Sequence, residues 1–171
     1  MESQLSEDWR AFLSLLNSHR VKYLLIGAHA LAVHGQPRMT ADLDVFVEAS
    51  LANARRLREV LIAFGFGAVA PPIEELAREE RVFMLGEPPF RIDVLTTISG
   101  VSFDDAYADR VRVKSEAGTL HVISRAHLVV NKRASGRTKD LLDLELLGEP
   151  PPRRPVAKGA RPKRKRTPRR T

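Results

Sequence analysis

The chain has 171 residues, of which 43% are hydrophobic, which is enough for about one globular domain with a core. It contains no cysteine, which excludes a disulfide framework, a cysteine-ligated zinc site and a thiol nucleophile. No secretory signal pattern begins the sequence and no apolar run approaches the roughly 18 residues that span a bilayer, so we expect a cytoplasmic protein with no membrane partner.

The net charge of +7 is distributed unevenly along the chain. Residues 149–171 carry ten Lys or Arg and one Glu, a local charge of +9, which leaves residues 1–148 at −2 out of the total of +7. The same segment has six prolines and one valine as its sole large apolar residue, so it cannot bury enough surface to offset its chain entropy. We therefore expect a folded domain over 1–148 and a disordered basic tail over 149–171. Such a tail is either a nucleic-acid-binding arm or a solubilising extension.

The first half of the domain alternates helices and strands. A serine followed by two acidic residues at 6–8 begins a helix, which apolar residues at helical spacing continue to about Asn17. The apolar run Tyr23–Ile26 predicts a buried strand that turns at Gly27 into a short helix over 28–34. Further along, the pattern predicts a strand over 42–48, a helix over 51–64 and a charged helix over 72–80.

The second half begins with two hairpins and ends with two helices. The expected elements are strands over 82–85 and 90–95, strands over 111–114 and 119–122, and helices over 124–134 and 138–147. Strands and helices alternate irregularly, so we predict an α+β fold in which a mixed β-sheet is flanked by helices.

Asp42 and Asp44 are the most informative residues of the sequence. Side chains two residues apart along a strand point the same way, so both carboxylates would emerge on one face. Two adjacent anions repel and are costly to bury unpaired, so a cation must stand beside them. Their hard oxygen ligands suit Mg²⁺ or Mn²⁺. Taken alone, an Asp-x-Asp pair also occurs in turns, in helix caps and arginine pairs, and in glycosyltransferases and phosphohydrolases.

Asp93 offers a third oxygen donor. It lies between Ile92 and Val94 in a predicted core strand, where an acidic residue usually needs a partner. If this strand lies beside the strand of Asp42 and Asp44, three carboxylates converge on one or two ions. Such an arrangement stabilises both the attacking and the leaving oxygen of an in-line phosphoryl displacement.

A candidate phosphate-binding turn precedes these acids. A strand that turns through Gly27-Ala28 into a helix leaves backbone N–H groups free to hold phosphate oxygens. Arg38 adds a positive charge and Thr40 a hydroxyl just before the acidic strand.

The order of these motifs resembles the nucleotidyltransferase superfamily, which includes DNA polymerase β, kanamycin nucleotidyltransferase and the small bacterial minimal nucleotidyltransferases. In that superfamily a strand leads into Gly-Gly or Gly-Ser and a helix, an Asp-x-Asp follows on the next strand, and a third Asp comes later. The matching residues here are Gly27-Ala28, Asp42-Leu43-Asp44 and Asp93. The second glycine-turn position is Ala28, which lacks a hydroxyl but keeps its backbone donor.

Two further motifs are similar to bacterial groups related to the AbiEii abortive-infection toxins. Their Arg-x-Thr-x-Asp-x-Asp pattern is filled by Arg38, Thr40, Asp42 and Asp44. Their later Lys and Arg-x-x-Asp-x-x-Asp-Leu are approximated by Lys132, Arg137, Asp140, Asp143 and Leu144. The resemblance spans about residues 23–147.

The resemblance implies a nucleotidyltransferase-like domain and assigns roles to its residues. Asp42, Asp44 and Asp93 would be the catalytic residues and hold Mg²⁺ or Mn²⁺, with Asp93 helping to deprotonate the acceptor. The nucleotide-binding residues would be Gly27, Ala28, Arg38, Thr40 and Lys132.

The resemblance therefore predicts an enzyme that transfers a nucleoside monophosphate from a nucleoside triphosphate, ATP among them, to an acceptor hydroxyl. The acceptor alternatives are tRNA, a protein and a small molecule, and the group implies a role in toxin–antitoxin or phage-defence systems with a cognate partner. Two other hypotheses stay open. The chain could be a non-catalytic descendant that binds a nucleotide or partner, or a nucleic-acid-binding protein that acts through its basic tail.

Overall fold

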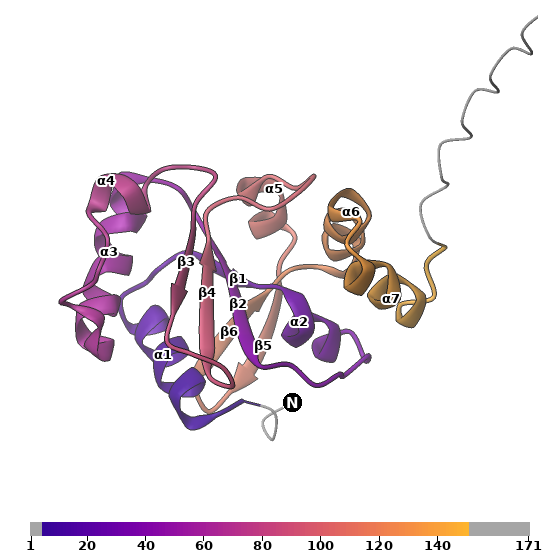
Figure 1. Ribbon diagram of the computed structural model, residues 1–171, viewed down its shortest axis with the longest axis horizontal. Helices are drawn as coiled ribbons and strands as arrows, with labels where there is room; N and C mark the ends of the chain where they lie inside the picture. The colour runs from indigo at the N-terminus through magenta and orange to yellow at the C-terminus, as the bar shows by residue number, and fades with distance from the viewer. Residues whose placement is uncertain (1–4, 151–171) are drawn as a thin grey trace, which may run out of the picture.

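The computed structural model describes residues 5–150 and contains a six-stranded mixed sheet (Figure 1). Its strands run in the order β3-β4-β2-β1-β6-β5. Their bounds are β1 Tyr23–Leu25, β2 Asp42–Val47, β3 Val82–Leu85, β4 Arg91–Leu95, β5 Val111–Ser115 and β6 Gly118–Val122. The predicted α+β class is confirmed, whereas the expected tail lies, from residue 151 onward, outside the described residues.

The sheet combines two antiparallel hairpins with two parallel pairings. β3 with β4 and β5 with β6 form the hairpins that the sequence predicts. β2 pairs in parallel with β4 and β1 pairs in parallel with β6, while β1 and β2 are antiparallel neighbours at the centre. The parallel β2–β4 pair therefore joins two segments that are far apart in the chain.

Helices cover both faces of the sheet. Figure 1 shows α1, α3 and α4 on one side, and α2, α5 and the helix pair α6–α7 on the other. The bounds are α1 Glu7–Ser18, α2 Gly27–Val33, α3 Leu51–Leu61, α4 Ile73–Leu76, α5 Phe103–Ala108, α6 Arg125–Ser135 and α7 Thr138–Leu146. Within residues 5–150 none of these helices combines the length and the apolar character that a membrane span requires.

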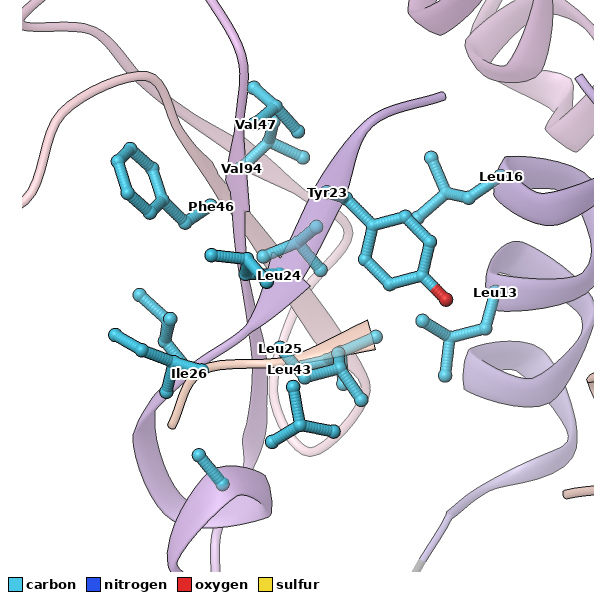
Figure 2. Close-up of a cluster of buried hydrophobic side chains, with 14 of the residues drawn as sticks. Leu13, Leu16, Tyr23, Leu24, Leu25, Ile26, Leu43, Phe46, Val47 and Val94 are labelled. Carbon is cyan, nitrogen blue, oxygen red and sulfur yellow. The ribbon is translucent and has the colours of Figure 1, made fainter. Parts of the chain in front are cut away.

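Part of the core lies between the sheet and α1 (Figure 2). The hydroxyl of Ser6 caps α1 by accepting a hydrogen bond from the Trp9 backbone N–H, as the predicted helix start implied. Leu13 and Leu16 of α1 are fully buried and face Tyr23 of β1. Burial of these large apolar side chains supplies the main driving force for docking α1 onto the central strands.

Strands β2 and β4 each have one apolar face and an opposite face that carries the acidic residues. Leu43, Val45, Ile92 and Val94 are buried in the core. Because side chains alternate along a strand, the residues between them project from the opposite face, toward α2 and α6–α7. This alternation places the acidic residues of both strands on the same side of the sheet.

Three stretches differ from the sequence prediction. The charged helix expected over 72–80 is a single turn, α4, which ends at Leu76; beyond it Glu80 has a left-handed backbone with φ of 60°, and its N–H donates to the Thr97 hydroxyl. The helix expected over 51–64 ends at Leu61 and continues as the π-helical turn η2, Ile62–Phe66. Helix α5 was not predicted, because its six residues are too short to show a helical period.

Candidate active site

The three acids predicted from the sequence converge on one face of the β2–β4 pair. In the parallel register Asp44 lies opposite Asp93, and Asp42 lies opposite Arg91. One carboxylate oxygen from each of the three acids lies within 4.8 Å of the chosen oxygens of the other two. The donors are hard carboxylate oxygens, which fits the ligand preference of Mg²⁺ or Mn²⁺.

Arg91 binds two of the three carboxylates. Its Nε donates to Asp93 Oδ1 at 2.8 Å, and its Nη2 donates to Asp93 Oδ2 at 2.9 Å and to Asp42 Oδ2 at 3.0 Å. Sequence reasoning missed this residue. The signal was present, since Arg91 and Asp93 have the same two-residue spacing that places Asp42 and Asp44 on one face.

Asp44 is the acid of this cluster that Arg91 does not reach. Among residues 5–150, no side chain donates a hydrogen bond to its carboxylate within hydrogen-bonding distance. Burial, and then the neighbouring charge of Asp42, raise the pKa of Asp44 from 3.8 to about 6, with an opposing contribution from Lys139. When Asp44 is ionised, its carboxylate is therefore the least neutralised negative charge of the cluster.

Gly27 is held against Asp44. Its backbone has φ of +62°, and a Cβ built on it would lie 2.1 Å from Asp44 Oδ2. The neighbouring Ile26 N–H donates to the Asp44 backbone carbonyl at 3.2 Å, which keeps this turn beside β2. A side chain cannot be accommodated here, so glycine is required both by the backbone conformation and by the close approach.

A second charged cluster joins α6 and α7 to the loop before β2. Lys132 is 3% exposed, and its Nζ donates to Asp140 Oδ1 at 3.2 Å and to Asp143 Oδ2 at 2.5 Å. Arg38 donates to both carboxylate oxygens of Asp143, at 2.8 and 3.2 Å, and Arg137 donates to Asp140 at 2.8 Å. Burial opposes ionisation of Asp140, but hydrogen bonds from Arg137 and Ser135 and the charge of Lys132 lower its pKa overall.

Replacing Asp143 with alanine should destabilise the fold strongly. The substitution leaves the buried Lys132 with one carboxylate instead of two and releases Arg38, and breaking a buried ion pair typically costs roughly 3–5 kcal/mol. Urea unfolding followed by circular dichroism measures the change. Leu142→Ala, at an exposed position of the same helix, is the control and should cost well under half as much. Equal losses for the two variants would contradict a stabilising role for the cluster.

Both clusters line one cavity with a volume of about 440 Å³. Its wall includes all three acids of the β2–β4 pair and Gly27. Five cationic side chains also line it: Arg38, Arg91, Lys132, Arg137 and Lys139. The cavity wall therefore carries charges of both signs, with the carboxylates of the β2–β4 pair facing a largely cationic side.

Two predicted nucleotide-binding residues, Ala28 and Thr40, are not among the residues that line the cavity. Ala28 is buried within α2. The Thr40 hydroxyl donates to Asp42 Oδ1 at 2.6 Å and so orients that carboxylate. Lys132 lines the cavity but is already paired, and Arg137 and Lys139 were not among the predicted site residues.

The fold and the site together define a nucleotidyltransferase-like domain, in which a strand, a glycine turn and a helix precede an Asp-x-Asp strand beside a third Asp. Comparison with protein families agrees: the chain belongs to the family described as nucleotidyltransferase of unknown function (DUF6036), whose model matches residues 4–147. A comparison with curated proteins finds no match.

Proposed function

We propose that the protein is a metal-dependent nucleotidyltransferase that moves a nucleoside monophosphate from a nucleoside triphosphate to an acceptor hydroxyl. One observation carries the proposal. Asp42, Asp44 and Asp93 meet on one sheet face, at the wall of a cavity that five cationic side chains also line. Membership of a nucleotidyltransferase family supports it.

The acids would hold Mg²⁺ or Mn²⁺. The bound ion would neutralise charge on the attacking oxygen, the α-phosphate and the leaving group. The acceptor oxygen forms a bond to the α-phosphorus, the bond from that phosphorus to the β-phosphate oxygen breaks, and pyrophosphate leaves. We propose Asp93 as the residue that helps to remove the hydroxyl proton.

The triphosphate would lie against the cationic side of the cavity. We propose that the backbone N–H groups of Gly27 and Ala28 contact phosphate oxygens, with Arg38 and Lys132 supplying positive charge and Thr40 holding Asp42 in place. Arg137 and Lys139 line the same cavity and extend this set. Because Arg38, Lys132 and Arg137 already pair with Asp140 and Asp143, these cations would offset part of the charge of a triphosphate.

For the biological setting, we propose a toxin or modifying component of a toxin–antitoxin or phage-defence pair, with ATP as a donor. The motif Arg38-x-Thr40-x-Asp42-x-Asp44, similar to that of AbiEii-related groups, supports it. We propose tRNA as the acceptor, since the ten basic residues within 149–171 suit RNA phosphates. A protein hydroxyl and a small molecule are the alternative acceptors.

Arg91 favours one other function, that of a non-catalytic descendant that binds a nucleotide or a partner. A guanidinium that pairs with Asp42 and Asp93 partly neutralises the cluster without any metal. Such a descendant would transfer no nucleoside monophosphate, whether or not it binds a nucleotide.

Label transfer distinguishes these functions. The full chain is incubated with α-labelled nucleoside triphosphates, Mg²⁺ or Mn²⁺, and total tRNA or cell extract, and Mn²⁺–ATP binding is followed in parallel by electron paramagnetic resonance. Wild type should bind Mn²⁺–ATP and transfer label, and Asp42→Asn should reduce transfer by about 100-fold or more. Asp104→Asn, at an exposed position on α5, is the control and should match wild type. Equal transfer by wild type and Asp42→Asn, or no Mn²⁺–ATP binding by wild type, would contradict the proposal.

A further inference from the structure

Arg91 occupies the position where a cation is needed in the carboxylate cluster. It lies two residues before Asp93 on β4 and opposite Asp42 in the β2–β4 register, so four side chains form a square of three acids and one base. Its Nη2 lies 3.0 Å from Asp42 Oδ2 and 2.9 Å from Asp93 Oδ2, and therefore bridges the two strands. The side chain is 29% exposed and also lines the cavity, so it has room to move outward.

The hydrogen bonds of the cluster leave little free for a metal ion. Both oxygens of Asp93 accept from Arg91, and the two oxygens of Asp42 accept from Arg91 and from Thr40. A divalent ion shared by the three acids would also stand close to the guanidinium, which repels it. With three negative charges against one positive charge, however, the cluster keeps a net charge of −2, which still attracts a cation.

We propose that Arg91 is a positioning residue that orients Asp42 and Asp93 while no nucleotide is bound and must release them when metal enters. The inference rests on the proposed function. Phosphate oxygens of an incoming nucleotide are good acceptors for the released guanidinium, because arginine binds phosphate through paired N–H groups. Metal and nucleotide therefore bind cooperatively, and the metal by itself binds weakly.

A purely structural role for Arg91 predicts the opposite response to mutation. If the guanidinium served only to hold the acids in a metal-binding arrangement, its loss would let the carboxylates move apart and would weaken metal binding. If it competes with the metal, its loss strengthens metal binding. The direction of the change in Mn²⁺ affinity therefore separates the two roles without any activity measurement.

The test is a titration of Mn²⁺ into the full chain, with and without ATP, followed by electron paramagnetic resonance. Arg91→Met should bind Mn²⁺ in the absence of ATP about tenfold more tightly than wild type, and the enhancement by ATP should be smaller by a similar factor. Arg91→Gln should behave in the same way, and provides a second variant if the first does not fold. Arg91→Lys keeps the charge but not the paired donors, so it should fall in between.

Arg112→Met is the matched control. Arg112 is an exposed residue of β5, at the other edge of the sheet, and its loss changes the net charge equally. Its Mn²⁺ affinity should equal that of wild type. An unchanged or weaker Mn²⁺ affinity in folded Arg91→Met and Arg91→Gln, with Mn²⁺–ATP binding intact in wild type, would overturn the role of Arg91 alone. No Mn²⁺ binding by any variant, with or without ATP, would overturn both this inference and the proposed function.

Discussion

Replacing Gly27 with alanine should abolish nucleotidyl transfer and destabilise the fold. The new Cβ would lie 2.1 Å from Asp44 Oδ2, so either the turn before α2 or the carboxylate must move. The φ of +62° adds a cost of roughly 1–2 kcal/mol for any residue with a Cβ, and relief of the clash adds about 1–3 kcal/mol. Chemical unfolding and label transfer measure the two effects.

Gly35→Ala provides the matched control for this substitution. Gly35 also has a positive φ, of +85°, but a Cβ there would have no atom within 4 Å. The Gly35→Ala variant should therefore lose only the stability that the positive φ costs a residue with a Cβ, and it should keep its transfer activity. If Gly27→Ala lost no more stability than Gly35→Ala and stayed active, the close packing of the glycine turn against Asp44 would have no functional importance.

Replacing Asp44 with asparagine should abolish transfer while making the metal-free protein more stable. Asp44 lies beside Asp42, and its carboxylate receives none of the donors of Arg91, so its charge destabilises the fold when no ion is bound. Asparagine has nearly the same shape and no charge, but it cannot act as an anionic metal ligand. We expect transfer to fall by about 100-fold or more.

The pH dependence of stability gives the sign of the Asp44 effect. Its pKa is raised from 3.8 to about 6, so between these values the folded state holds this proton more tightly than the unfolded state. The contribution of Asp44 to the free energy of unfolding is therefore fully present below pH 3.8. This contribution decreases by about 3 kcal/mol as the pH rises from 3.8 to about 6. The difference in unfolding free energy between Asp44→Asn and wild type, measured with a chelator, should grow over this range.

Asp93→Asn is the comparison that tests the assignment of charge within the cluster. Asp93 accepts two hydrogen bonds from Arg91, so neutralising it removes a charged pair and should lower stability at neutral pH. Opposite signs for Asp44→Asn and Asp93→Asn are expected above about pH 6. A loss of stability in both would mean that Asp44, too, is stabilised by a cation in the folded protein.

Local pattern in the sequence was sufficient for most elements and for the acids themselves. The two-residue period of a strand places Asp42 and Asp44 on one face, and apolar neighbours place Asp93 in a core strand, because these relations depend only on backbone geometry. The glycine turn at Gly27 was found for the same reason. The roles of Ala28, Thr40 and Lys132 toward a nucleotide remain predictions.

Only the tertiary structure decided which of these residues meet. β4 follows β2 after α3, η2, α4 and β3, and no local signal determines that it returns to lie parallel to β2 with Asp93 opposite Asp44. The same register brings Arg91 against Asp42, and the packing of α7 on α6 buries Lys132 between two acids. The sequence by itself determined which faces are acidic and where the chain turns. Long-range packing determined the partners of each charge, because a charge pairs with whatever the fold brings within a few ångströms and not with its neighbours in the chain.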